Sequence, residues 1–245
     1  EVFKEIFQGM LETLQENVRI LYRGEVIVLE HIKYHQKFGW VLEANPKGAV
    51  GNEAKIFLGK LSLIEKTKIL MGKRTYISGP SIIRGGAELK VGSFCSLGEH
   101  LYINTSRDGH PLKCPSTVNF SGNSRIVEDG FDIPTKYSEF DAIKNGVEIG
   151  SDVWIARRVR ISNGVNIGDG CVIAENSLVR NDCEPYGIYG GTPAKLIRYR
   201  FDKDVIEQLL QIRWWDWSIE RIQKNKVFFE ADLTDSKVLI EHLIF

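Results

Sequence analysis

The chain has 245 residues, with 32 Lys and Arg against 32 Asp and Glu, so its formal net charge is zero at pH 7. A balanced charge argues against a protein that binds nucleic acid through its phosphates, because such domains carry a basic excess. Hydrophobic residues at 43% and charged residues at 26% exclude a wholly disordered chain, and no run of about 18 apolar residues predicts a membrane span.

The first 70 residues show no regular repeat. Four apolar residues near the start stand at helical spacing and predict a short amphipathic helix. They are Phe3, Phe7, Met10 and Leu14. Residues 17–68 mix strand-like runs such as EVIVLEHI with turn signals such as ANPKG, so we expect a small α/β segment there.

The start of the chain and its thiols bear on where the protein resides. The first residues, EVFKEIFQGM, place charges among the apolar positions and lack the continuous apolar core of a signal peptide. Four cysteines without a C-x-x-C pair argue against a structural zinc site and favour reduced thiols. We therefore expect a cytoplasmic protein.

Aliphatic residues recur every six positions between residues 87 and 103. Val91, Leu97 and Ile103 form this series, and a glycine follows each of the first two. The series is a weaker copy of a pattern that becomes regular further along the chain.

Residues 104–146 interrupt the six-residue spacing with polar sequence that contains Pro and Gly. A connection of this length within a compact domain is usually functional or disordered. It carries His110, Cys114 and Ser116, so this insert is a candidate for chemistry.

Residues 147–182 divide into six hexads: VEIGSD, VWIARR, VRISNG, VNIGDG, CVIAEN and SLVRND. The third position of every hexad is aliphatic, and the fourth is small in five of the six. Positions one and three of a strand point the same way, whereas a period of six cannot keep one face of an α-helix apolar. The pattern therefore predicts a parallel β-helix with inward aliphatic columns and small residues at the corners, where a larger side chain would clash. Three cysteines fall on inward columns and are expected to fill space there: Cys95, Cys171 and Cys183.

After residue 183 the chain leaves the repeat through EPYGIYGGTPAK and enters FDKDVIEQLLQIRWWDWSIERIQKN, a helical pattern with Asp202 as its N-cap. A β-helix ends in an open strand edge, so we expect this Trp-rich helix to cover it. The predicted organisation is an N-terminal segment at 1–70, a β-helix domain at 71–200 with the inserted loop 104–146, and a C-terminal helical cap and tail at 201–245.

Three segments together resemble the hexapeptide-repeat acyltransferases, in the branch that includes the chloramphenicol and streptogramin acetyltransferases and related sugar acetyltransferases. They are DGHPLKCPST (108–117), SDVWIARRV (151–159) and PYGIYGGTPAKLIRYRF through IRWWDWSIERI (185–222). The resemblance implies a left-handed parallel β-helix, acetyl-CoA as the acyl donor, and a homotrimer whose active sites lie between subunits. This chain has Thr192 where the family often has Asn.

Acyl transfer from a thioester requires that the acceptor alcohol or amine lose a proton as it attacks the carbonyl. A histidine with a pKa near ~6.5 suits this work as a general base. The resemblance implies that His110 is this base, six residues before Ser116, with Ser116 and Asn119 at the acceptor. Cys114, four residues after His110, is the alternative nucleophile, which direct transfer from a thioester does not require.

Acetyl-CoA carries phosphates and a long pantetheine arm. Lys195, Arg198 and Arg200 follow the last coil and are candidates to bind the phosphates; a solvated cationic edge is the alternative interpretation. The resemblance implies that Trp154, Ala156 and Ala174 line the pantetheine arm, where plain corner packing is the alternative. It also implies that two residues of the GGTPAK segment approach the cofactor closely, namely Gly191 and Thr192.

The predicted activity is acetyl transfer to a hydroxyl or amine of a sugar, nucleotide sugar or glycan precursor, with an antibiotic acceptor as the alternative. A γ-type carbonic anhydrase requires three histidines around a metal, and the coils from 147 to 183 contain none, so no metal is expected. His31 and His35 stand four apart but lack an accompanying acidic motif. A non-catalytic β-helix scaffold remains the third class, and it would need neither the His-bearing insert nor the basic exit segment.

Overall fold

The computed structural model describes residues 18–22, 25–28, 32–35, 39–43, 55–58, 61–64, 69–78, 81–85, 87–105, 115–117, 146–234 and 240–244. The helix predicted near the N-terminus, His110, Cys114 and Asn119 lie outside these residues. For His35 and His242 the structure describes the backbone only.

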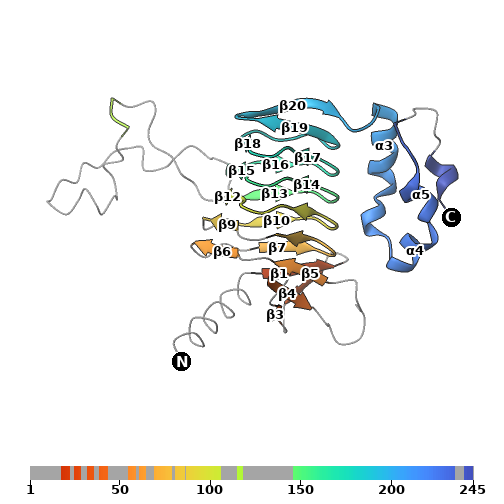
Figure 1. Cartoon of the computed structure of the whole chain (residues 1–245), viewed down its shortest axis with the longest axis horizontal. Helices are drawn as coiled ribbons and strands as arrows, with labels where there is room; N and C mark the ends of the chain where they lie inside the picture. Colours follow the sequence, from red (N-terminus) through yellow and green to blue (C-terminus); the bar gives the residue numbers. More distant parts are fainter. Residues whose placement is uncertain are drawn as a thin grey trace.

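Three sheets of mostly parallel strands form the sides of a three-sided prism (Figure 1). We name them faces A, B and C in the order in which the chain visits them, and name each corner by the faces it joins. Face A contains, in spatial order, β16 (Asn166–Ile167), β13 (Val147–Ile149), β10 (Leu89–Val91), β7 (Ile69–Gly72), β1 (Val18–Tyr22) and β2 (Glu25–Val28). Face B contains β20 (Ala194–Tyr199), β19 (Gly187–Gly191), β17 (Val172–Ile173), β14 (Trp154–Ile155), β11 (Ser96–Leu97), β8 (Tyr76–Ile77), β5 (Lys55–Leu58), β4 (Gly39–Glu43) and β3 (Ile32–His35). Face C contains β18 (Leu178–Val179), β15 (Arg160–Ile161), β12 (Tyr102–Asn104), β9 (Ser81–Arg84) and β6 (Leu61–Ile64).

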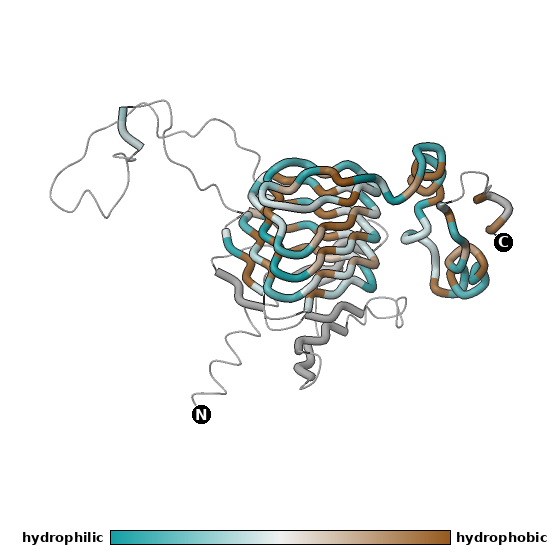
Figure 2. The backbone as a smooth tube through the Cα atoms, turned by 45° about the horizontal axis from the view of Figure 1, so that its top comes forward, coloured by the Kyte–Doolittle hydropathy of each residue, from teal (hydrophilic) through white to brown (hydrophobic). Residues whose placement is uncertain are grey.

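Four coils visit all three faces in turn, so the predicted parallel β-helix is confirmed. They span 69–83, 89–103, 147–161 and 165–179, and each strand pairs in parallel with the strand one coil away. The predicted columns form one buried core, in which Ile155, Ile173 and Cys171 are fully inaccessible. Hydrophobic and hydrophilic stretches accordingly alternate along each coil in Figure 2.

Small residues at the fourth hexad position are required by the neighbouring coil. A β-carbon on Gly150 would lie 2.5 Å from Asp169 Oδ1, and one on Gly168 would lie 2.6 Å from the nitrogen of Pro185. The left-handed backbone that turns the corner lies two residues later, for example at Asp152 (φ 57°) and Asn176 (φ 61°). The predicted clash is therefore real, but it arises between coils.

The first coil, 69–83, lies almost wholly in the predicted β-helix domain, although the sequence analysis did not identify its six-residue spacing, and two of its inward positions are polar. Thr75 and Ser81 are buried on these positions and bond the backbone. Thr75 Oγ1 donates to the Gly92 carbonyl at 2.5 Å and accepts from the Cys95 amide at 3.1 Å. Parallel pairing continues further upstream, since β5 pairs with β8 and β6 with β9.

The insert leaves and rejoins the prism at one corner. Thr105 follows β12 at the end of face C, and its amide donates to the Arg84 carbonyl at 2.7 Å. Gly146 precedes β13 on face A, and its amide donates to the Thr105 carbonyl at 3.4 Å. The segment with His110 is thus attached at the C–A corner, between the second and third coils.

The helix expected to close the open end of the prism lies elsewhere, so that prediction was wrong. The antiparallel hairpin β19–β20 supplies the last strands of face B, and the helices lie beside the coils (Figure 1). These elements are α3 (Lys203–Ile212), the 3-10 helix η2 (Trp214–Asp216), α4 (Ile219–Lys224), α5 (Lys226–Glu230) and the 3-10 helix η3 (Ile240–Leu243).

The Trp-rich segment packs against the A–B corner. Trp214 lies 4.9 Å from Phe94 between ring centroids, and Trp215 is fully buried in a cluster with Tyr186. Lys73 Nζ donates to the Trp217 carbonyl at 2.8 Å. The rings of Phe94 and Tyr186 give the helices an apolar surface to bury at this corner, which explains the location. None of the helices in the described part is both long and apolar enough to span a bilayer.

Candidate active site

The B–C corner carries a stack of small residues from successive coils. Ala156 and Ala174 occupy the fourth hexad position, and their amides donate to the carbonyls of Ile173 and Tyr189 at 2.9 and 2.8 Å. Gly190 continues the stack, since a β-carbon there would lie 3.2 Å from Ala174 Cβ. Because their side chains are at most a methyl group, the backbone of this corner can be approached closely by a ligand.

The β19–β20 hairpin ends on the same corner. The Gly191 amide donates to Ser177 Oγ at 3.2 Å, and Thr192 Oγ1 donates to the Asn176 carbonyl at 3.3 Å. Ser177 Oγ also donates to the Ala174 carbonyl at 2.6 Å. Four of the predicted cofactor residues are therefore brought together here: Ala156, Ala174, Gly191 and Thr192.

Asn176 and Ser177 are residues of this corner that the sequence prediction omitted. Ser177 occupies an inward position that holds an aliphatic residue or cysteine in the five preceding hexads, and it is 1% exposed. A buried hydroxyl needs a partner, and here it finds two in the backbone. The change from aliphatic to Ser in the inward column was the signal available in the sequence.

Trp154 lies on face B, two residues before the corner at Ala156. It points outward with 56% of its surface exposed, between Ser96 and Val172 in the ladder of parallel strands. An exposed indole beside a corner of accessible backbone provides a flat apolar surface for a ligand.

The predicted phosphate-binding residues are spread along β20. Lys195 pairs opposite Gly190 near the B–C corner and is exposed. Arg198 pairs opposite Ile188, farther along the strand, and its Nη1 donates to the Tyr199 carbonyl at 2.8 Å. Lys195 thus belongs to the corner stack, whereas Arg198 lies toward the opposite end of face B.

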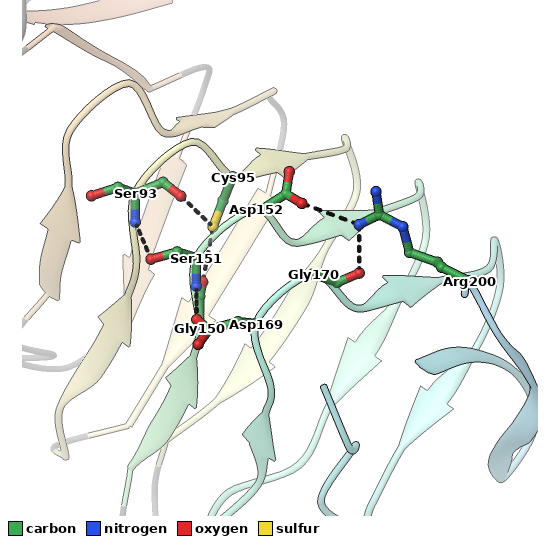
Figure 3. Close-up of polar contacts among 8 residues, drawn as sticks. All are labelled: Ser93, Cys95, Gly150, Ser151, Asp152, Asp169, Gly170 and Arg200. Carbon is green, nitrogen blue, oxygen red and sulfur yellow. Dashed lines mark hydrogen bonds and ion pairs between the residues drawn. The ribbon is translucent and has the colours of Figure 1, made fainter. Parts of the chain in front are cut away.

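Arg200 is not brought to the B–C corner. Its Nη1 donates to Asp152 Oδ2 at 3.1 Å and to the Gly170 carbonyl at 2.8 Å, both at the A–B corner (Figure 3). Its guanidinium also lies 5.2 Å from the Tyr186 ring centroid. The physical reason is that β20 runs antiparallel to β19 and carries the chain back across face B, roughly 20 Å over six extended residues.

The A–B corner is a network of polar contacts. Asp169 Oδ1 accepts from the Ser151 amide at 2.6 Å, and Ser151 Oγ accepts from the Ser93 amide at 3.1 Å (Figure 3). Burial raises the pKa of Asp152, while Arg200 acts in the opposite direction. These groups join coils to one another and to the end of β20, so we interpret them as structural.

An open cavity of about 460 Å³ lies where β20 passes into α3. Its lining consists of Arg198, Tyr199, Arg200, Phe201, Asp202, Lys203 and Thr234. It carries cations together with the carboxylate of Asp202, and it lies on the A–B side of the prism. It is therefore separate from the small-residue stack.

The three cysteines of the inward columns are buried, as predicted. Desolvation raises the pKa of Cys95, Cys171 and Cys183 to about 12. Thiols of this kind are not nucleophiles near neutral pH. Within the described ranges no group of three His, Cys, Asp or Glu side chains could hold a metal ion.

Of the predicted acceptor residues only Ser116 is described, and it is half-buried in the short range 115–117 of the insert. His100, which the sequence prediction did not assign to chemistry, is exposed at the B–C corner with a left-handed backbone (φ 58°).

Comparison with known proteins identifies relatives over the same region. The model of the bacterial transferase hexapeptide family (six repeats) matches residues 146–181. A chloramphenicol acetyltransferase of Agrobacterium fabrum is 36% identical, over 65% of this chain and 81% of the relative. A probable macrolide acetyltransferase of Lysinibacillus sphaericus is 40% identical, over 57% of this chain and 76% of the relative. The galactoside O-acetyltransferase of Escherichia coli is 27% identical, over 58% of this chain and 70% of the relative.

Proposed function

The chain belongs to the hexapeptide-repeat acyltransferases, in the branch of the xenobiotic acetyltransferases, and from that premise we propose how this acetyltransferase works. The donor is acetyl-CoA, and the acceptor is a hydroxyl group of an antibiotic. The names of the chloramphenicol and macrolide acetyltransferases support this acceptor, which the sequence analysis gave as the alternative. The sugar acceptor expected first is the second candidate, supported by the galactoside O-acetyltransferase.

The observation that carries the donor site is the small-residue stack at the B–C corner. Ala156 and Ala174 leave the corner backbone open to the pantetheine arm, and the exposed Trp154 covers the arm from face B. Gly191 and Thr192 bound the pantetheine arm at the end of the stack nearest the β19–β20 hairpin, and Lys195 binds the phosphates there. Arg198 lies toward the opposite end of face B and lines the separate cavity, so it is left out of the donor site. Arg200 is left out of the donor site because its guanidinium is already bound at the other corner.

His110 is the general base, and Ser116 and Asn119 orient the acceptor. The support for His110 is its place in the insert, matched to the catalytic histidine of the family. As the acceptor oxygen bonds to the thioester carbonyl carbon, its proton passes to the imidazole. The C–S bond then breaks, and the imidazolium returns the proton to the departing thiolate, which leaves as CoA. The step needs no metal and no protein thiol, so Cys114 has no role in it.

The working unit is a homotrimer with its active sites between subunits. A single prism presents convex faces and corners, whereas ligand sites are concave and bury most of the ligand. Neighbouring prisms supply the second wall of the groove, which fits a closed cyclic assembly.

Two experiments test the function. Mass spectrometry of products from a panel of chloramphenicol, a macrolide, galactosides and aminosugars identifies the acceptor. If none of them is acetylated at millimolar acetyl-CoA, the proposed acceptor classes are refuted.

The second experiment tests the general base. The variant His110→Ala should lower kcat by about two to four orders of magnitude, while the affinity for CoA, measured by calorimetry, stays within about a factor of two. Turnover near that of the parent chain would remove His110 from the mechanism.

A further inference from the structure

The fifth hexad position differs between the A–B and B–C corners. At the A–B corner of coils two to four it holds short polar residues, namely Ser93, Ser151 and Asp169. At the B–C corner of the same coils it holds long charged residues, namely Glu99, Arg157 and Glu175. The two sets have the same spacing along the chain, so their hydrogen bonds can be compared coil by coil.

The short side chains close the A–B corner. The Ser93 amide donates to Ser151 Oγ at 3.1 Å, and the Ser151 amide donates to Asp169 Oδ1 at 2.6 Å (Figure 3). Each side chain thus accepts from the amide one coil earlier. A β-carbon on Gly92 or Gly150 would lie 2.5 Å from the same two oxygen atoms. These oxygens fill the space beside the fourth position, and the two amides are not available to a ligand.

The long side chains leave the B–C corner open. Arg157 Nε donates to Glu175 Oε1 at 2.8 Å, so the two side chains bond each other. Within the described part of the chain, the amides of Glu99 and Arg157 donate to no other residue. The three atoms nearest to a β-carbon on Gly98 all belong to the backbone, beginning with Arg157 N at 2.8 Å. No side-chain atom is as near to Gly98 as Ser151 Oγ is to Gly92.

The Arg157–Glu175 ion pair is exposed, with 55% and 36% of the two side chains accessible. The hydrogen bond from Glu175 and, at longer range, the charge of Glu99 raise the pKa of the Arg157 guanidinium. An exposed pair of this kind contributes little to folding stability. Its consequence at this corner is therefore where the two side chains lie, alongside Ala156 and Ala174 rather than over the backbone between them.

We propose that the Arg157–Glu175 ion pair positions the donor site by keeping the Arg157 amide free to donate to a carbonyl oxygen of the acyl donor. Both members are positioning residues, since they act through the backbone between them. The inference rests on the proposed function, because it takes the B–C corner as the donor site. Amide and thioester carbonyls of an acyl-pantetheine arm are acceptors for such a donor.

Shortening the acid tests the proposal. Glu175→Asp keeps the charge and reproduces, in the same register, the residue type that accepts the Ser151 amide at the other corner. The shorter carboxylate should accept from the Arg157 amide and slow its hydrogen–deuterium exchange, resolved by mass spectrometry without CoA. CoA affinity, measured by calorimetry, should fall about three- to tenfold, the effect of one lost hydrogen bond. The melting temperature should not fall, so damage to the fold would not explain the loss. Glu175→Ser repeats the test with the residue type that accepts the Ser93 amide.

Two matched variants separate reach from charge and one corner from the other. Glu175→Gln still reaches Arg157 but carries no charge, so it should retain CoA affinity within about a factor of two. Asp169→Glu makes the reverse change at the A–B corner. It should speed exchange of the Ser151 amide and lower the melting temperature by about 2–4 °C, with CoA affinity unchanged.

Four results would overturn the proposal. Slower exchange of the Arg157 amide with the CoA affinity of the parent would mean that the donor does not use this amide. Weaker CoA binding without slower exchange would mean that the pair contacts the donor directly. Equal losses of affinity in the Asp and Gln variants would assign the effect to charge, and no change in either the Asp or the Ser variant would remove the pair from the site. A parent chain that binds no CoA at millimolar concentration would instead refute the donor site of the proposed function.

Discussion

The A–B and B–C corners follow the same hexad rule, yet one is covered and the other is open. At the A–B corner the sixth hexad position holds Phe94 and Tyr186, and the C-terminal helices pack onto these rings. At the B–C corner the same position holds His100 and Asn176, and no helix of the described part covers it. The same position at the A–B corner also holds Asp152 and Gly170, so two aromatic rings in a column of mixed residues are enough to give the protein's own helices a surface to pack on, and the B–C corner, which has none, stays open.

Two tryptophans provide the largest contrast between the corners. Trp215 is fully buried among the helices at the A–B corner, whereas Trp154 on face B is 56% exposed. Trp215→Ala should lower the free energy of unfolding by about 3–5 kcal/mol, because it leaves a large cavity. Trp154→Ala should change it by less than about 0.5 kcal/mol and weaken acetyl-CoA binding. Urea unfolding and calorimetry measure both; equal losses of stability would contradict the assignment.

Glycine at the fourth position is predicted to matter at the covered corner. Gly168→Ala puts a β-carbon 2.6 Å from the Pro185 nitrogen and 2.8 Å from its Cδ. Overpacking of this kind should cost about 1–3 kcal/mol of unfolding free energy. Thermal unfolding checks it, and an unchanged melting temperature would mean that the coils can separate at this corner.

Arg200→Leu tests the contact that ties β20 to the A–B corner, and its effect should depend on pH. Burial already raises the pKa of Asp152 above 3.8, and Arg200 opposes that rise. Without the guanidinium the pKa of Asp152 in the folded protein rises further, so the folded state binds a proton that the unfolded state has released. The stability of the variant should therefore fall as pH rises through the range above 3.8.

The unfolding free energies of the variant and the parent chain, compared at two pH values, give the sign of this pH dependence. The deficit in unfolding free energy of Arg200→Leu should be smaller at pH 4 than at pH 7, where about 1–2 kcal/mol is expected for this pair, whose side chains are 29% and 26% exposed. Donor affinity should stay unchanged, because Arg200 lies outside the donor site. A deficit independent of pH, or a loss of CoA binding, would refute this interpretation.

Ala174→Leu tests the open corner and should have the smallest effect on stability. A larger side chain at this position fills the proposed donor site at the corner, where Ala174 stacks with Gly190 of the hairpin. Binding of CoA should weaken about tenfold, which corresponds to ~1.4 kcal/mol, at an unchanged melting temperature. Unchanged affinity would show that the donor does not use this corner.

Most of the β-helix was predictable because each hexad repeats the same two requirements, an inward aliphatic residue and a small corner residue. Coil 69–83 lay almost wholly in the predicted β-helix domain, but its hexads were not identified individually, because Thr75 and Ser81 replace one apolar column with hydroxyls that bond the backbone. The location of the C-terminal helices could not be predicted either, because in the sequence Phe94 and Tyr186 look like ordinary corner residues and nothing indicates that a second element covers them.

The site was predictable to the extent that it follows the coil register. Ala156 and Ala174 stack because they lie 18 residues, or three hexads, apart. Arg200 was misplaced because distance along the sequence does not reveal that β20 reverses direction after the hairpin.

A crystal structure of the chain with CoA tests the central claim most directly, because it locates the donor on one of the two corners. The pantetheine arm should lie along the B–C corner, with hydrogen bonds to the backbone near Ala156 and Ala174 and the phosphates near Lys195. A CoA molecule bound at the A–B corner, or in the cavity where β20 passes into α3, would contradict the account.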